Sequence, residues 1–547
     1  MALTSHYPYA SPGPSAAEVA RDAAVLQMAR ALFVAACVAV MIYASNAPSA
    51  LVFVDIHNPE AESPAARLAW VPLYLLTLAL LVLRLPHVLR LVTFAPLLVV
   101  CVLVAGLSVM WSVDPALSLR RAVALAMTTS LGLVLAAWLG WSKLIQGAAL
   151  AFAALALISV AVVLADPARG IMSEVYPGAW RGPWMQKNDL GGMMTKGLIA
   201  CLGACAVRPG RVWLYGPAAL LCFALVLAST SKTALLISVG AVGLAGWIAL
   251  YRGVAALRPL LWLGLIGGVG GVVAALTLAP EATLGLIGKD PTFTGRTEIW
   301  AALRLAIEAR PGLGYGYGAF WMDPLGPSYI VREVLEWGVP SAHNGWVEIW
   351  LSGGVLLVGV FGAHMVLVLG VLLRRLARGG REIYWAALSL LAFLGFSLSE
   401  SAILQQNDLT WVLFVAASAK LLAGERMPDQ RRRPRDAGIA AMAVALPRRL
   451  RLPAPDTSAW PAAVSALPAR MAVPVAAPAR PVVAPPWTLP RRLDERPLPA
   501  VAAQLRQALP PVADIVPLPP APPPSPPTAP LAEPSLAPMP EATTRVA

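Results

Sequence analysis

Apolar runs long enough to cross a bilayer recur along this chain from about Ala29 to Gly424. A membrane-spanning helix needs roughly 17 to 25 such residues, and each run meets that length. The 547 residues are 58% hydrophobic and 13% charged, a balance far outside the range of soluble globular domains. The sequence therefore predicts an all-α polytopic membrane protein and excludes a soluble fold.

Hydropathy predicts about twelve transmembrane helices. Their expected ranges are 29–47, 68–84, 90–110, 121–140, 144–165, 189–207, 212–230, 233–251, 259–280, 344–373, 383–399 and 409–424. Together, residues 29–424 form the predicted membrane domain. The preceding polar stretch, residues 1–28, has no clear cleavage site, so we expect a cytoplasmic N-terminal segment and a retained first helix.

Alternate short connections are basic, as at Arg208 and Arg211 or at Arg374 and Arg375. The positive-inside rule then places both chain ends in the cytoplasm. Residues 425–547 are rich in Pro, Ala and Arg and bury too little apolar area to offset their ordering entropy, which predicts a disordered cytoplasmic tail. This tail and the inner loops account for much of the net charge of +13. Anionic lipid headgroups explain that charge, and no nucleic-acid partner is required.

Polar islands fall on the opposite, extracytoplasmic side of the predicted topology. They are residues 111–122, 180–192, 229–236, 293–300, 311–321, 341–350 and 399–408. Several carry Arg or Lys, against the positive-inside trend, and the longest loop, about 281–343, is far longer than an ordinary connection. Guanidinium groups hold phosphate oxygens bidentately, so these islands predict a site for an anionic group. The aromatic residues among them fit either an interfacial belt or sugar stacking.

Several other chemistries lack support in the residues. The glycines of PGLGYGYG, residues 311–318, are not followed by GK[ST] or preceded by a strand, which argues against a nucleotide loop and favours a sharp turn. No spacing selects a pair of carboxylates for glycosidase chemistry, and no DxD cluster is present. Cys201 and Cys205 are one helical turn apart but have no further Cys or His nearby. We expect neither a metal nor a cofactor.

The ordered motifs WSVDPALSLRRA, RGPWMQKNDLGG, TSKTALL, TGRTEIW, AHNGWVEIWLSGGV and SESAILQQNDLTW together resemble the O-antigen ligase and Wzy-type polymerase family. WSVDPALSLRR and GRTEIW look most like its ExoQ-like exopolysaccharide polymerase branch. The resemblance covers roughly residues 70–424. It departs from the familiar pattern at Gln186, where a histidine is common, and at Lys232, where an arginine is frequent.

This resemblance implies a GT-C-like membrane glycosyltransferase that polymerises undecaprenyl-pyrophosphate-linked repeat units of a surface polysaccharide. The reaction would take place without a metal at the outer face of the bacterial inner membrane. Position by position, His343 matches a histidine proposed to activate the acceptor hydroxyl, and Arg296 matches an arginine proposed to engage the pyrophosphate. The lipid-linked oligosaccharide, membrane lipids and polysaccharide export or chain-length proteins are the implied partners. Further residues expected to bind pyrophosphate or glycan are Arg120, Arg121, Arg181, Lys187, Asn188, Lys232, Tyr315 and Asn344.

Alternatives stay open at this stage. The same donor would serve a ligase that transfers glycan to lipid A core or protein, and intramembrane cations also fit a transporter or flippase. Asn344 could simply cap the helix that follows it. Arg296 could be a side chain that extends to the membrane surface, and Arg120 and Arg121 could start a helix beside lipid headgroups.

Overall fold

The computed structural model describes residues 16–54, 64–173, 176–279, 282–283, 285, 296–322, 326–336 and 338–425. These residues are almost entirely helical, with one isolated β-bridge between Ile171 and Trp180. The predicted all-α polytopic fold is therefore confirmed. The predicted tail, apart from its first residue, lies outside the described residues.

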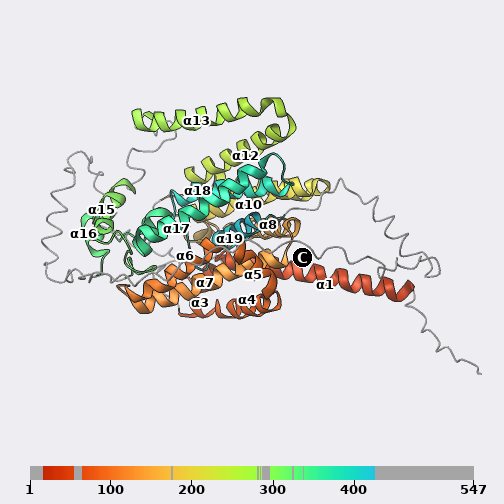
Figure 1. Ribbon diagram of the computed structural model, residues 1–547, viewed down its shortest axis with the longest axis horizontal. Helices are drawn as coiled ribbons and strands as arrows, with labels where there is room; N and C mark the ends of the chain where they lie inside the picture. Colours follow the sequence, from red (N-terminus) through yellow and green to blue (C-terminus); the bar gives the residue numbers. More distant parts are fainter. Residues whose placement is uncertain are drawn as a thin grey trace, which may run out of the picture. The chain divides into compact units, whose positions relative to one another are not determined.

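The helices of the first half are α1 (Ala16–Ala44), α2 (Ala47–Phe53), α3 (Pro64–Leu68), α4 (Val71–Leu83), α5 (Leu85–Phe94), α6 (Pro96–Leu107), α7 (Pro115–Trp138), α8 (Trp141–Ala165), α9 (Pro167–Gly170) and α10 (Lys187–Val207). Those of the second half are α11 (Val212–Ala228), α12 (Lys232–Gly253), α13 (Arg258–Leu278), α15 (Arg296–Ala309), α16 (Tyr329–Leu335), α17 (Gly345–Leu376), α18 (Glu382–Ser397) and α19 (Leu409–Leu422) (Figure 1).

Each of the twelve predicted spans coincides with helix in the structure. In the described part of the chain, nine helices are long and apolar enough to cross a membrane. The third predicted span is the pair α5 and α6, bent by 94°, and the last two are the shorter helices α18 and α19. Helix α1 begins at Ala16, well before the expected start near residue 29, because AAEVARDAAVLQMAR consists mostly of good helix formers.

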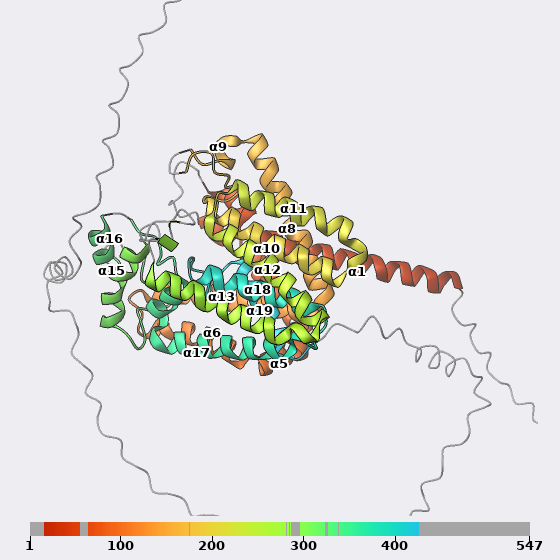
Figure 2. The same cartoon turned by 90° about the horizontal axis from the view of Figure 1, so that it is seen from above.

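Close helix packing forms the centre of the bundle, where α10 contacts α8, α11, α12 and α18 (Figure 2). Glycines on α10 make this possible. A Cβ at Gly197 would lie 2.8 Å from the sulfur of Cys222, and one at Gly203 would lie 2.7 Å from the Cβ of Trp385. Small residues allow helix backbones to approach closely in membranes, where burial of apolar surface does not drive association.

A second, smaller core lies in the segment that the sequence predicts as one long loop. Helices α15 and α16, the turn at residues 311–321 and the first turns of α17 pack together there, and we call this part the loop lobe (Figure 1). Its core includes Leu303, Phe320 and Trp321. The lobe meets a kink in α17, where Gly354 has φ 62°. A Cβ on Gly354 would lie 2.1 Å from the carbonyl carbon of Gly312, so the kink requires glycine.

Candidate active site

Arg296 and His343 contact the same carboxylate, that of Glu400. Arg296 Nη2 lies 3.1 Å from Glu400 Oε1, and His343 Nδ1 lies 3.6 Å from Glu400 Oε2. The side chains are 16%, 30% and 33% exposed for Arg296, His343 and Glu400 respectively. Arg296 begins α15, His343 precedes α17, and Glu400 lies in the connection between α18 and α19. The fold thus brings both expected catalytic residues to one point at the boundary between the loop lobe and the helical bundle.

The backbone around His343 shows why it faces this point. Asn344 is the N-cap of α17, and its Oδ1 accepts hydrogen bonds from the backbone N–H groups of Trp346 (2.9 Å) and Val347 (3.3 Å). The alternative left open for Asn344, that it caps the following helix, is therefore what the structure shows. His343 itself has φ 47°, a conformation that costs free energy in a non-glycine residue and often marks a functional position.

The two ring nitrogens of His343 have different surroundings. Nδ1 is buried, faces Glu400 and has no hydrogen-bond partner. Because Nδ1 is enclosed while 30% of the side chain is exposed, Nε2 is the nitrogen that can reach a bound molecule. A neutral imidazole with a proton on Nδ1 presents Nε2 as a base.

Glu348, in the first turn of α17, connects the segments on either side of the cluster. Its carboxylate accepts hydrogen bonds from the backbone N–H of Ala342 (2.6 Å), from Trp321 Nε1 (3.1 Å) and from Ser401 Oγ (3.3 Å). Ala342 directly precedes His343, and Ser401 directly follows Glu400. Glu348 therefore fixes the backbone next to both members of the His343–Glu400 contact.

Sequence reasoning missed the roles of Glu400 and Glu348. In the sequence, Glu348 is one of several carboxylates that no spacing pairs, and Glu400 is one residue of the polar island at 399–408. One available signal was that Glu400 is an acidic residue between two apolar helices, where an ionisable group is costly unless it has a partner.

A second basic group lies at the N-termini of α10 and α12. Lys187 Nζ donates to Thr230 Oγ1 (3.3 Å), and Ser231 Oγ donates to Asn188 Oδ1 (2.9 Å). Lys232 is the first residue of α12. These bonds hold two helix N-termini beside each other, and each N-terminus carries a partial positive charge and unpaired N–H groups. Together with the two ammonium groups, this arrangement suits an anion.

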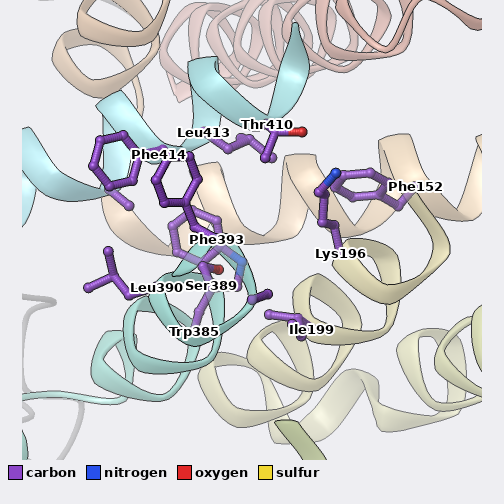
Figure 3. A pocket seen from close by; sticks show the side chains of 12 residues that line it. Phe152, Lys196, Ile199, Trp385, Ser389, Leu390, Phe393, Thr410, Leu413 and Phe414 are labelled. Atoms are coloured by element: carbon purple, nitrogen blue, oxygen red, sulfur yellow. The ribbon is translucent and has the colours of Figure 1, made fainter. Parts of the chain in front are cut away.

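Asp189 connects this basic group to the first cluster. It is close enough to both Glu400 and Lys196 for electrostatic interaction. Lys196 lines a pocket between α8, α10, α18 and α19 together with Thr410 and several aromatic side chains (Figure 3). The pocket has a volume of about 40 Å³, which is enough for a few water molecules but too small for a sugar. Most of the side chains that line the pocket are apolar, and the pocket does not form a glycan site.

Two of the arginines expected to bind substrate donate hydrogen bonds to loop backbone in this structure. Arg181 donates from Nε to the carbonyl of Arg169 (2.8 Å) and from Nη2 to that of Ala168 (3.0 Å). Arg121 donates from Nη1 to the carbonyl of Gly318 (2.6 Å). Arg120, one position earlier on α7, is exposed. The guanidinium groups of Arg121 and Arg181 are thus engaged by backbone oxygens of the protein.

Tyr315 also has a packing role. It is buried in the core of the loop lobe, and its hydroxyl donates to the carbonyl of Ala306 (2.7 Å). The glycine-rich segment around it forms the expected sharp turn, with φ 65° at Gly314, 99° at Gly316 and 68° at Gly318. A Cβ at Gly316 would lie 2.2 Å from Ser112 Oγ, so the turn lies directly against the segment before α7.

Tyr317 ties this turn to the connection that carries Glu400. Its hydroxyl donates to the carbonyl of Leu404 and lies 2.8 Å from Gln406 Oε1. Burial raises the pKa of the Tyr317 phenol, which keeps it protonated as a donor. Among the described residues, no group of three or more His, Cys, Asp or Glu side chains could hold a metal ion.

Two comparisons with known proteins bear on this site. Residues 217–362 match the O-antigen ligase family model, a stretch that contains Arg296 and His343. The exopolysaccharide production protein ExoQ of Rhizobium meliloti (strain 1021) is 29% identical over 278 residues, which cover 48% of this chain and 61% of ExoQ. The chain thus matches less than two thirds of this relative's length. These matches agree with the resemblance found in the motifs: residues 217–362 of this multi-pass membrane protein are similar to the O-antigen ligase family, and the chain is similar to ExoQ.

Proposed function

We propose that the protein polymerises undecaprenyl-pyrophosphate-linked repeat units of a surface polysaccharide at the outer face of the bacterial inner membrane, without a metal. The observation that supports this most directly is the shared contact of Arg296 and His343 with Glu400. A base for the acceptor hydroxyl, His343, and a cation for the departing phosphate, Arg296, therefore both contact one side chain, that of Glu400. Both groups would accelerate glycosyl transfer from a diphosphate donor.

In the proposed reaction, His343 Nε2 accepts the proton of the acceptor hydroxyl. The acceptor oxygen attacks the anomeric carbon from the face opposite the phosphate, which inverts the configuration. The bond between that carbon and the phosphate oxygen breaks, and its electron pair leaves with the lipid pyrophosphate. Arg296 meets the negative charge that develops, with Lys187 and Lys232 as further cations. General-base catalysis of this kind contributes roughly a hundred- to ten-thousand-fold.

The lengths of α18 and α19 favour a lipid-linked donor. They have 16 and 14 residues, or roughly 24 and 21 Å at the rise of an α-helix. Both are shorter than the hydrocarbon core of a bilayer, about 30 Å. If their far ends lie at one membrane surface, Glu400 lies below the other surface. A phosphate attached to an isoprenoid chain can reach that depth. The irregular backbone around Glu400 is tolerated at that depth only if it lines a polar cavity, and such a cavity would admit the phosphate.

The test is polymer formation from purified lipid-linked repeat units by the full-length protein in liposomes. We expect His343→Ala and Arg296→Ala each to lose at least a hundredfold in rate and to leave single units. Matched controls are His87→Ala, an exposed imidazole on α5, and Arg304→Ala, a 70% exposed arginine on α15 itself, both with unchanged rates. Normal polymer from the His343 variant would exclude this histidine as the base.

A ligase is the second candidate, because the matched family model is described as O-antigen ligase. It would use the same donor and the same chemistry with a different acceptor, lipid A core or protein. A deletion strain distinguishes the two functions. Loss of long polymer with single units still on the lipid carrier supports the polymerase, whereas full-length polymer that is not attached to lipid A core or protein supports the ligase.

A further inference from the structure

We infer that Glu400 is exchanged between two partners during turnover: it holds Arg296 while the site is empty and passes to His343 when the diphosphate of the donor takes Arg296. This inference rests on the proposed function and adds a step to it. It makes Glu400 a positioning residue that acts through His343. Its consequence is an order of events in which the base is oriented only after the donor has bound.

The distances show which partner Glu400 holds in this structure. Arg296 Nη2 and Glu400 Oε1 are 3.1 Å apart, a charge-assisted hydrogen bond. His343 Nδ1 and Glu400 Oε2 are 3.6 Å apart, outside hydrogen-bonding range. Nδ1 is buried and has no other partner within that range. While Glu400 Oε1 binds Arg296, His343 Nδ1 lacks a hydrogen-bond partner, and a small movement of Glu400 would bring Oε2 within hydrogen-bonding range of it.

The surroundings allow the side chain to move while the backbone stays fixed. The next residue, Ser401, donates to Glu348, and Glu348 also holds Ala342 beside His343. The carboxylate of Glu348 therefore fixes the distance between the backbone segment that carries His343 and the one that carries Glu400. The Glu400 side chain is 33% exposed and hydrogen-bonds to Arg296, so it can rotate when that bond is lost.

The charges favour the exchange. A diphosphate offers Arg296 more negative charge than one carboxylate does, and it can bind the guanidinium bidentately. Glu400 then loses its cation and stays near Asp189, another carboxylate, and Lys196. A hydrogen bond from His343 Nδ1–H to the freed carboxylate fixes the tautomer with Nε2 as acceptor. It also stabilises the imidazolium that forms when Nε2 takes the proton from the acceptor hydroxyl.

The first test measures binding of inorganic pyrophosphate to the full-length protein in detergent. We expect Glu400→Gln to bind about two- to fivefold more tightly than wild type, because Arg296 no longer has to leave an ion pair of that strength. Arg296→Ala should bind more weakly than wild type. The double variant Arg296→Ala/Glu400→Gln should bind like Arg296→Ala alone. Equal tightening in both backgrounds would show a general loss of negative charge and would overturn the exchange.

The second test separates binding from chemistry. With lipid-linked repeat units, Glu400→Gln should lower KM for the donor and also lower kcat by at least tenfold, a combination that a loss of folded structure would not produce. Glu400→Asp, which keeps the charge, should recover part of kcat. An unchanged kcat in Glu400→Gln would overturn the inference while leaving the proposed function intact. Wild-type protein that does not bind pyrophosphate and forms no glycosidic bond would overturn both.

Discussion

The two ends of the helical bundle each contain a cluster of charged residues, and the clusters are built differently. At the end with the loop lobe, Arg296, His343 and Glu400 are between 16% and 33% exposed. At the other end, Arg375 and Glu382 form a 3.1 Å ion pair with exposures of 9% and 0%. The first cluster lies between two separate cores, whereas the second lies among helices of a single core.

The buried cluster is closed by the protein's own groups. Glu382 Oε1 accepts hydrogen bonds from Arg375 Nη2 and from the backbone N–H of Gly380, both at 3.1 Å. Nearby, Lys420 Nζ donates to the carbonyls of Ala136 and Leu139, both at 3.0 Å. Charges held in this way stabilise one arrangement of helices. The partly exposed cluster has a carboxylate between two partners and side chains that are 16% to 33% exposed, which suits it to bind and react.

The largest effect on stability is expected in the buried cluster. Glu382→Gln leaves the Arg375 guanidinium buried without its counter-charge, and loss of one partner of a buried pair costs about 3–5 kcal/mol. Thermal unfolding of the protein in detergent would measure this. Glu308→Gln is the control, because Glu308 pairs with Arg304 at 3.6 Å on the surface, with exposures of 60% and 70%. Its cost should be below about 1 kcal/mol. Equal costs would show that burial does not distinguish the two pairs.

A smaller effect on stability, but a large one on rate, is expected at Glu348. Glu348→Gln places an amide donor opposite the donors of Ala342, Trp321 or Ser401, which costs about 1–3 kcal/mol. Because His343 then shifts relative to Glu400, we expect kcat to fall between tenfold and a hundredfold. Binding of inorganic pyrophosphate, measured in parallel, should change less than threefold, on the order of 0.6 kcal/mol. An equal loss of kcat and of pyrophosphate affinity would indicate that the loop lobe had simply unfolded.

The contrast between the two ends also shows what the sequence could predict. Hydropathy located a helix at each of the twelve predicted ranges because each depends on a local run of apolar residues. The cluster of Arg296, His343 and Glu400 depends instead on contacts between residues far apart in sequence; Arg296 and Glu400 are 104 positions apart. Neither composition nor spacing indicates such a contact. Family resemblance identified Arg296 and His343, but only the fold shows that Glu400 joins them.

Two expected binding residues that hold loop backbone, Arg121 and Arg181, illustrate the same limit. The sequence alone does not show whether an arginine on a polar island binds a phosphate or donates to a backbone carbonyl. Arg121 and Arg181 do the latter, with backbone acceptors at 2.6 Å and 2.8 Å. Lys187 and Lys232, in contrast, lie at helix N-termini, where the backbone supplies donors rather than acceptors. Local backbone polarity therefore separates the anchoring arginines from the lysines that we propose to bind an anion.

The smallest effect tests this distinction at Tyr315. Burial raises the pKa of its phenol, so near neutral pH the hydroxyl is protonated and donates to Ala306. Tyr315→Phe removes that bond and leaves the carbonyl of Ala306 without this donor, at a cost of about 1 kcal/mol. If Tyr315 only supports the loop lobe, the melting temperature falls slightly while kcat and KM for the lipid-linked donor stay at wild-type values. A rise in KM without a change in melting temperature would return Tyr315 to the substrate-binding residues and would show that the loop lobe contacts the glycan directly.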